Sequence, residues 1–134
     1  LAVGLAQGAL EAAVEHAKNR VQFGHPVTSI QAVQHILANM AMDVEAARAL
    51  MYATAKTIDS GVKHYSEEGA MAKVFATDMA MRVTTDAVQV CGGAGYMRDA
   101  GVEKVVRDVN HLRAAGGSPP EAALFVAAWE RAHA

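Results

Sequence analysis

The sequence predicts an all-α protein, an antiparallel bundle of four to five helices, from three observations. Its 134 residues make one ordinary domain, and 52% of them are hydrophobic, enough to fill a single core. Only 5% are aromatic, so alanine and medium aliphatic side chains must do the packing, which suits closely packed helices better than a β-sandwich. Apolar residues recur at steps of three and four. We therefore expect one domain over residues 1–134.

The first helix is expected over residues 1–19. One of its sides should be apolar and carries Leu5, Ala9, Ala12 and His16. The motif Phe23-Gly24-His25-Pro26 should end it in a loop, because proline cannot donate to a continuing helix and glycine favours a turn. The chain opens without methionine and already in helical register, so its start looks like a cut in a longer chain.

The second helix should begin at Thr28 or Ser29, where Thr28-x-x-Gln31 fits a capping box, and should stop at Ser60-Gly61. Its length of roughly 30 residues corresponds to about 45 Å. A helix of that length needs a facing partner to be stable.

The third helix supplies that partner. It should begin at Ser66, with two glutamates in a first turn that favours acids, and should end at Cys91-Gly92-Gly93. The residues that complete the two longest apolar stripes are expected to be buried, namely Met40, Val44, Met51, Phe75, Met79 and Val83. Shorter helices are expected over residues 102–112 and, after Pro119-Pro120, over residues 121–133.

Composition excludes several functions. Twelve basic against fourteen acidic residues give a net charge of −2, so nucleic acid is not an expected partner. No apolar run reaches the roughly 18 residues of a membrane span. The single cysteine, Cys91, allows no internal disulfide, which favours a reducing, cytoplasmic location. The six histidines do not supply the two Glu-x-x-His pairs of a di-iron bundle, and Cys91 has no cysteine neighbour, so no metal site is expected.

The first candidate site is Arg20-Val21-Gln22-Phe23-Gly24, where a helix gives way to a turn. Arginine offers a planar fork of donors suited to a diphosphate, Gln22 donates and accepts, and Phe23 presents a flat face. The alternative is structural: Arg20 is a solvated residue that offsets the helix dipole, and Phe23 fills the core.

The second candidate site is the stretch from Gln89 to Tyr96, which holds three glycines in four positions. Glycine lets a backbone approach a ligand closely and exposes amides that can meet phosphate oxygens. No strand precedes it, so it is not a dinucleotide fingerprint. A glycine-closed helix end is the structural alternative.

A third candidate is the charged stretch of residues 103–108, in which a buried or interfacial pair of Arg107 and Asp108 is one interpretation. Most charge clusters are solvated faces, and a structural role is expected here.

Taken in order, these motifs resemble the acyl-CoA dehydrogenase family over residues 1 to about 113. The resemblance is carried by the Arg20-x-x-Phe23-Gly24 turn, Gln31 at the head of a long helix, and the stretch from Asp86 to Tyr96. It is also carried by the shorter matches Ala38-Asn39-Met40, Glu45-Ala46-Ala47-Arg48, Ala72-Lys73 and Arg107-Asp108.

The resemblance implies the carboxy-terminal helical domain of a three-domain FAD enzyme whose amino-terminal helical and middle β domains are not in this chain. It implies FAD contacts, largely to the pyrophosphate and adenosine and across subunits, by Arg20, Gln22, Phe23, Gln31, Gln89, Gly92 and Gly93. The implied partners are an acyl-CoA substrate, further subunits in a dimer or tetramer, and an electron-transferring flavoprotein or similar acceptor.

The family reaction is α,β-dehydrogenation of an acyl-CoA, in which a glutamate removes the α-proton and the β-hydrogen passes as hydride to the flavin. The glutamate position of many members corresponds to Gly116, which has no side chain, so no catalytic residue is assigned. In some subfamilies the base stands on the first helix, at a position upstream of Leu1. Glu121 is a further alternative at a different spacing.

Two functions therefore stay open. The chain is the FAD-contacting domain of an active dehydrogenase, or it is a catalytically silent helical bundle or partner subunit that serves oligomerisation or protein interaction. In either case the 134-residue chain alone is expected neither to hold FAD tightly nor to oxidise an acyl-CoA.

Overall fold

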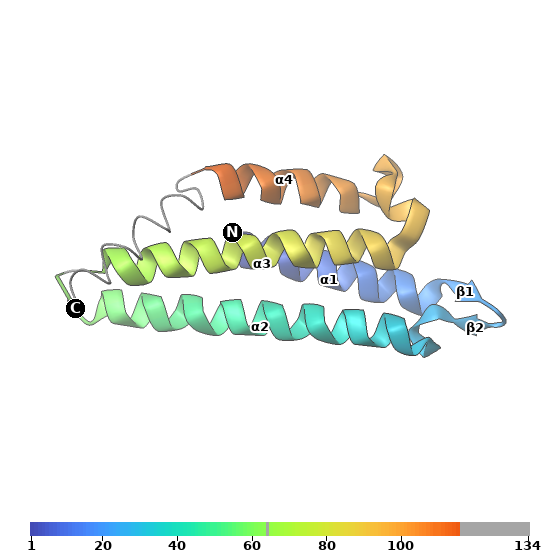
Figure 1. Ribbon diagram of the computed structural model, residues 1–134, viewed down its shortest axis with the longest axis horizontal. Helices are drawn as coiled ribbons and strands as arrows, with labels where there is room; N and C mark the ends of the chain where they lie inside the picture. Colours follow the sequence, from blue (N-terminus) through green and yellow to red (C-terminus); the bar gives the residue numbers. More distant parts are fainter. Residues whose placement is uncertain (64, 116–134) are drawn as a thin grey trace.

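The computed structural model describes residues 1–63 and 65–115, which contain four α-helices packed lengthwise (Figure 1). Their bounds are α1 Ala2–Asn19, α2 Gln31–Asp59, α3 Ser66–Cys91 and α4 Val102–Ala114. Consecutive helices run antiparallel, and α3 contacts the other three. The predicted all-α bundle is confirmed, while the expected helix over residues 121–133 lies outside the described residues.

Two irregular connections lie at one end of the bundle (Figure 1). Between α1 and α2 the chain forms a hairpin of two short strands, β1 Val21–Gln22 and β2 His25–Pro26, followed by the 3₁₀ turn η1 Val27–Ser29. Between α3 and α4 it forms two further 3₁₀ turns, η2 Gly92–Tyr96 and η3 Arg98–Ala100. The loop predicted at residues 23–26 is therefore the tip and return of a hairpin.

The core is a layer of small residues on α1 that lets α3 approach closely. The buried face of α1 consists of Val3, Ala6, Ala9, Ala13 and Ala17, packed in the same core as Met79, Ala80, Val83 and Ala87 of α3. Of the predicted face, Ala9 is buried and Leu5 packs partly buried against the core, His16 is half-buried, and Ala12 is exposed. Alanines stand on several sides of α1, so apolar spacing does not single out one of them.

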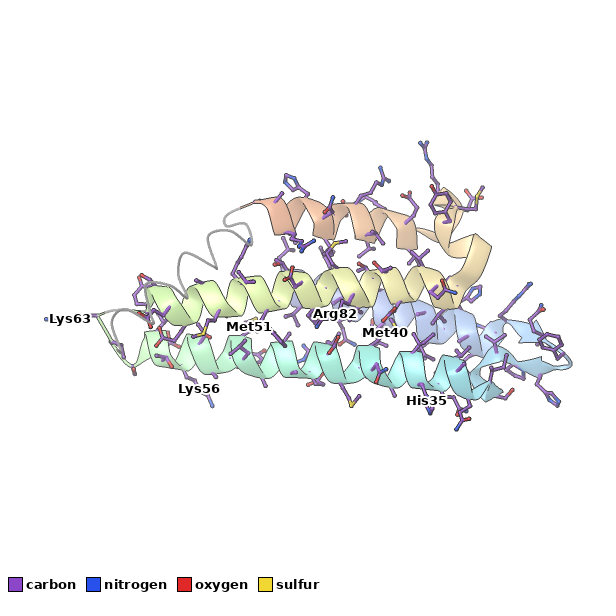
Figure 2. All side chains as sticks on the ribbon, viewed as in Figure 1. His35, Met40, Met51, Lys56, Lys63 and Arg82 are labelled. Atoms are coloured by element: carbon purple, nitrogen blue, oxygen red, sulfur yellow. The ribbon has the colours of Figure 1, made fainter. Side chains whose placement is uncertain are left out.

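The two long stripes are buried in their middle and exposed toward one end. Met40, Val44, Met79 and Val83 are buried as predicted, at 0–1% exposure. Met51 and Phe75, which were also expected to be buried, are 37% and 39% exposed. Figure 2 shows Met40 well inside the span of α2 and Met51 farther toward the α2–α3 turn. Near Met51 α1 is only beginning, so the layer that covers the middle of the stripe is incomplete among the described residues.

The start of α2 also differs from the prediction. The helix begins at Gln31, its N-cap is Ile30, and no side chain caps it. Thr28 and Ser29 belong instead to η1, where Ser29 Oγ donates to the carbonyl of Pro26 at 2.8 Å. The predicted capping box was wrong because the 3₁₀ turn η1 occupies Thr28 and Ser29 and the helix starts only after Ile30.

Candidate functional site

The hairpin between α1 and α2 presents its tip to solvent. Phe23 and Gly24 both have positive φ, 53° and 83°, as a two-residue turn between antiparallel strands requires. A phenylalanine in the left-handed region is strained, at a cost of about 1 kcal/mol. Its side chain is 92% exposed, so the alternative in which Phe23 fills the core was wrong. The strain and exposure together mark a residue that the fold of this chain does not need.

The glycine turn after α3 is built by backbone that only glycine allows. Gly92 has φ 60° and ψ −143°, the mirror image of an extended conformation. Gly95 is buried against the end of α3, where an added Cβ would lie 2.7 Å from Cys91 Cβ and 2.9 Å from the carbonyl oxygen of Val88. This turn is more than a helix stop, because its third glycine, Gly95, is required by packing.

The hairpin and the glycine turn meet around one hollow of about 430 Å³. Its wall brings together the two motifs singled out from the sequence, Arg20 and Gln22 on one side and Gly92 and Gly93 on the other. Val90, Cys91 and Ala94 of the same glycine stretch also line it. The remaining lining residues were not predicted as site residues: His16, Val27, Ile30 and Val33. His16 stands one helical turn before Arg20, a spacing that points both side chains the same way.

Three of the predicted site residues lie outside this lining. Phe23 is at the hairpin tip, Gln31 is the exposed first residue of α2, and Gln89 is exposed in the last turn of α3. All three stand at the same end of the bundle as the hollow (Figure 1). Of the seven predicted FAD-contacting residues, four therefore line one cavity and three lie on the surface outside it. Gly116 lies outside the described residues.

The charge of the hollow is set by Arg20. No aspartate or glutamate is among its lining residues in the described chain. Burial raises the pKa of the Cys91 thiol, so this group stays neutral. Arg48, Arg82, Arg107 and Arg113 each hold a carboxylate, whereas the guanidinium of Arg20 has no such partner among the described residues. An unpaired guanidinium, an amide and a glycine backbone around one cavity suit an anionic group such as a phosphate.

The charges on α4 form a solvated face. Arg107 pairs with Glu103 at 2.9 Å and Lys104 pairs with Asp108, each one turn apart on the same helix. Within the described chain Arg107 and Asp108 therefore pair with Glu103 and Lys104 and not with each other, in agreement with the solvated face expected for this stretch.

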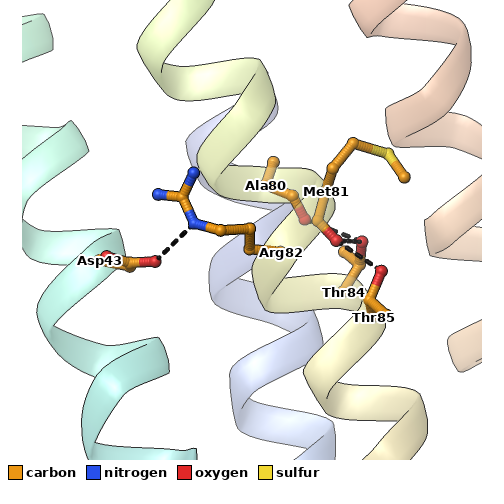
Figure 3. A network of polar contacts seen from close by, with 6 residues as sticks. All are labelled: Asp43, Ala80, Met81, Arg82, Thr84 and Thr85. Carbon is orange, nitrogen blue, oxygen red and sulfur yellow. Dashed lines mark hydrogen bonds and ion pairs between the residues drawn. The ribbon is translucent and has the colours of Figure 1, made fainter.

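A second charged group links α2 and α3. Figure 3 shows Arg82 Nε against Asp43 Oδ2, at 3.2 Å, and, on the other side of α3, Thr84 and Thr85, which donate back to carbonyls of their own helix. Asp86 stands one turn after Arg82. Burial first, and then the Asp43 carboxylate, raise the pKa of Asp86, while Arg82 acts in the opposite direction.

Other site types find no support in residues 1–63 and 65–115. In those two segments no three side chains of histidine, cysteine, aspartate and glutamate gather as metal ligands. Nor does either segment hold a helix both long and apolar enough for a membrane crossing.

Comparison with known proteins places this geometry in a family. The model of the family "Acyl-CoA dehydrogenase, C-terminal domain" matches residues 1–128. Cyclohex-1-ene-1-carbonyl-CoA dehydrogenase of Geobacter metallireducens is 54% identical over 107 residues, which are 80% of this chain and 28% of that protein. The structure of butyryl-CoA dehydrogenase from Megasphaera elsdenii has a TM-score of 0.90 and 40% identity, covering 95% of this chain and 33% of that one.

The FAD complex of PigA is also similar, with a TM-score of 0.90 at 25% identity over 99% of this chain and 34% of that one. The chain thus spans about a third or less of the length of the relatives that it matches.

Proposed function

Because the chain belongs to the acyl-CoA dehydrogenase C-terminal domain family, we propose that residues 1–134 are the carboxy-terminal helical domain of an FAD-dependent acyl-CoA dehydrogenase. In this proposal the amino-terminal helical and middle β domains belong to the same protein. The domain contributes FAD contacts and a subunit interface to the α,β-dehydrogenation of an acyl-CoA thioester.

One observation carries the cofactor role: Arg20 and Gln22 share a hollow with Gly92 and Gly93. The pyrophosphate of FAD carries two negative charges, so its binding site must supply hydrogen-bond donors or positive charge. The unpaired Arg20 guanidinium supplies a fork of such donors, and the glycines admit the phosphate close to the backbone. The PigA complex supports FAD as the ligand, since its fold is shared over nearly the whole chain.

Phe23 extends this contact beyond the hollow. A strained phenylalanine that is 92% exposed gains almost no packing from residues 1–63 and 65–115. Such strain persists where a ligand or partner repays it. We assign to Phe23 a contact with the adenosine side of FAD held by a neighbouring subunit, with Gln31 and Gln89 around it.

A second copy of the protein is the proposed partner at α2. The part of α2 away from the core exposes Met42 and Tyr52, at 63% and 58%, together with the exposed alanines at 46, 49 and 53. An apolar helix face of this kind supports a subunit contact in a dimer or tetramer. The acyl-CoA substrate, an electron-transferring flavoprotein or similar acceptor, and a reducing cytoplasmic location complete the proposal.

Bound FAD would supply the hydride acceptor, and the residues of this chain bind and orient it. Proton abstraction needs a base that the described residues do not assign. The two positions of interest, Gly116 and the residues before Leu1, adjoin Ala115 and Leu1, which line one apolar hollow at the other end of α1. Because Gly116 has no side chain, only the position upstream of Leu1 could hold a base, and Leu1 lines a hollow about 27 Å along α1 from the hollow beside Arg20 if α1 is straight.

Flavin retention in the full-length protein tests this function. Arg20→Ala should weaken the affinity for FAD by at least about tenfold, because a charge-assisted bidentate contact is lost. Less FAD per subunit should therefore remain bound after gel filtration. The circular dichroism spectrum should stay helical. Arg107→Ala, which removes an arginine from the solvated face of α4, is the matched control and should retain flavin as the parent does.

The opposite results are equally clear. A parent protein without FAD would refute the cofactor role, and an Arg20→Ala protein with full flavin would refute its assignment. A parent protein that holds FAD but oxidises no acyl-CoA would favour the catalytically silent partner subunit.

A further inference from the structure

The bundle has a second hollow, apolar and of about 310 Å³, at the end of α1 opposite the FAD hollow. All four helices contribute to its wall. Its small and medium apolar lining includes Ala2, Val3, Ala72, Ala76, Leu112 and Ala115. A hollow with this lining accepts an apolar group.

Lys73 is the charged residue in the wall of this apolar hollow. Its ammonium donates to the carbonyl oxygen of Arg113, in the last turn of α4, at 3.2 Å. Carbonyls in a last helical turn lack partners within their helix, and a cation there also meets the negative end of the helix dipole. Lys73 of α3 thus closes the end of α4.

A second interaction holds the same turn. Arg113 Nε lies 2.8 Å from Asp78 Oδ1 of α3, and both side chains are about half buried. The other α4 ion pairs of the described chain, at Lys104 and Arg107, stay within α4. The cross-helix ties therefore gather at the last turn of α4, next to the apolar hollow.

We propose that Lys73, with the Asp78–Arg113 pair, is a positioning residue of the dehydrogenation site: it fixes the last turn of α4, and with it the wall of the apolar hollow where the reacting carbons of the acyl group lie. This inference rests on the proposed function. The last turn of α4 leads directly to the Gly116 position, and the start of α1 on the same wall follows the alternative base position. A wall displaced by a fraction of an ångström misaligns proton and hydride transfer without weakening substrate binding.

Steady-state kinetics of the full-length holoenzyme tests the catalytic part. Lys73→Met keeps the length of the side chain and removes its donors; kcat should fall about tenfold while KM stays within about twofold and FAD content is unchanged. Lys73→Arg should restore at least half of kcat. Lys104→Met, the same change on the solvated face of α4, should keep the parent values. The kinetic isotope effect with α-deuterated substrate should rise in Lys73→Met, a readout that a merely structural role would not move.

Kinetics that stay within twofold of the parent, or a kcat loss matched by equal losses of FAD and thermal stability, would overturn the positioning role.

Amide hydrogen exchange on the 134-residue chain tests the contact between Lys73 and the last turn of α4 independently of any activity. Lys73→Met should speed exchange at residues 112–115 about tenfold and leave residues 105–109 unchanged. Unchanged exchange at residues 112–115 would overturn the tie itself. A parent protein that oxidises no acyl-CoA would instead refute the proposed function, and the exchange result would still decide whether Lys73 holds α4.

Discussion

The two long helices both end at glycine, yet their ends do different work. At the end of α2, Gly61 has φ 81° and nothing within 4 Å of an added Cβ, so it only lets the chain turn. At the end of α3, Gly92 takes a mirror-image extended conformation, Gly95 is pressed against the helix, and the turn borders a polar hollow. A glycine helix stop becomes a site when another glycine is required by packing and a charged residue from elsewhere faces it.

The largest effect should come from Gly95→Ala. Its Cβ would lie 2.7 Å from Cys91 Cβ and 2.9 Å from a backbone oxygen, neither of which can move freely. We expect the free energy of unfolding to fall by about 3 kcal/mol in urea titrations. Gly61→Ala is the matched change at the other helix end and should cost only about 1 kcal/mol, the strain of a positive φ. Equal losses at the two positions would remove the distinction between the ends.

Much of this fold follows from the sequence, because spacing and punctuation are local signals. Apolar spacing of three and four residues, together with glycine as a helix stop, predicted the all-α class, the limits of α3, and the burial of Met79 and Val83. The face of α1 did not, because alanine at many positions gives no contrast. Met51 was misjudged because its burial depends on where another helix begins.

The sequence identified most of the residue types of the candidate site, but it did not show how these residues lie in space. For Arg20 and for Gly92 the sequence also allowed a purely structural role, and only the structure shows that the two residues border one hollow. The exposure of Phe23 could not be inferred, since an aromatic residue after a helix usually packs inward. His16 was missed because a histidine in an alanine-rich helix carries no signal until its neighbour is known.

The hairpin that faces the end of α3 across the hollow offers the next test, with an expected effect of intermediate size. Phe23→Asn suits the left-handed turn position, so the isolated chain should gain about 1 kcal/mol of stability, seen as a higher urea midpoint. The full-length protein should hold FAD less tightly, because the exposed ring is lost. Gain in stability with loss of flavin would show that strain at this end serves the cofactor. A variant that loses stability would mean that Phe23 is held by contacts within the chain.

The smallest effect concerns charge before the end of α3. Asp86 is half buried, and burial together with Asp43 raises its pKa, with Arg82 opposing. Between the ordinary aspartate pKa, about 4, and the raised value, the folded chain binds more protons than the unfolded chain. Stability contributed by this site is therefore present at low pH and is lost as the pH rises through that window.

Asp86→Asn should remove this loss and stabilise the chain near neutral pH by about 0.5 kcal/mol or less, because solvent screens a partly exposed carboxylate. Urea midpoints measured from about pH 4 to pH 7 should then show a shallower fall in the variant than in the parent. Asp43→Asn, which keeps Asp86 and removes the neighbouring negative charge, should narrow the window without abolishing it, since burial is the larger cause. An Asp86→Asn chain with the slope of the parent would show that another group is responsible, and the end of α3 would then differ from the end of α2 by its glycines alone.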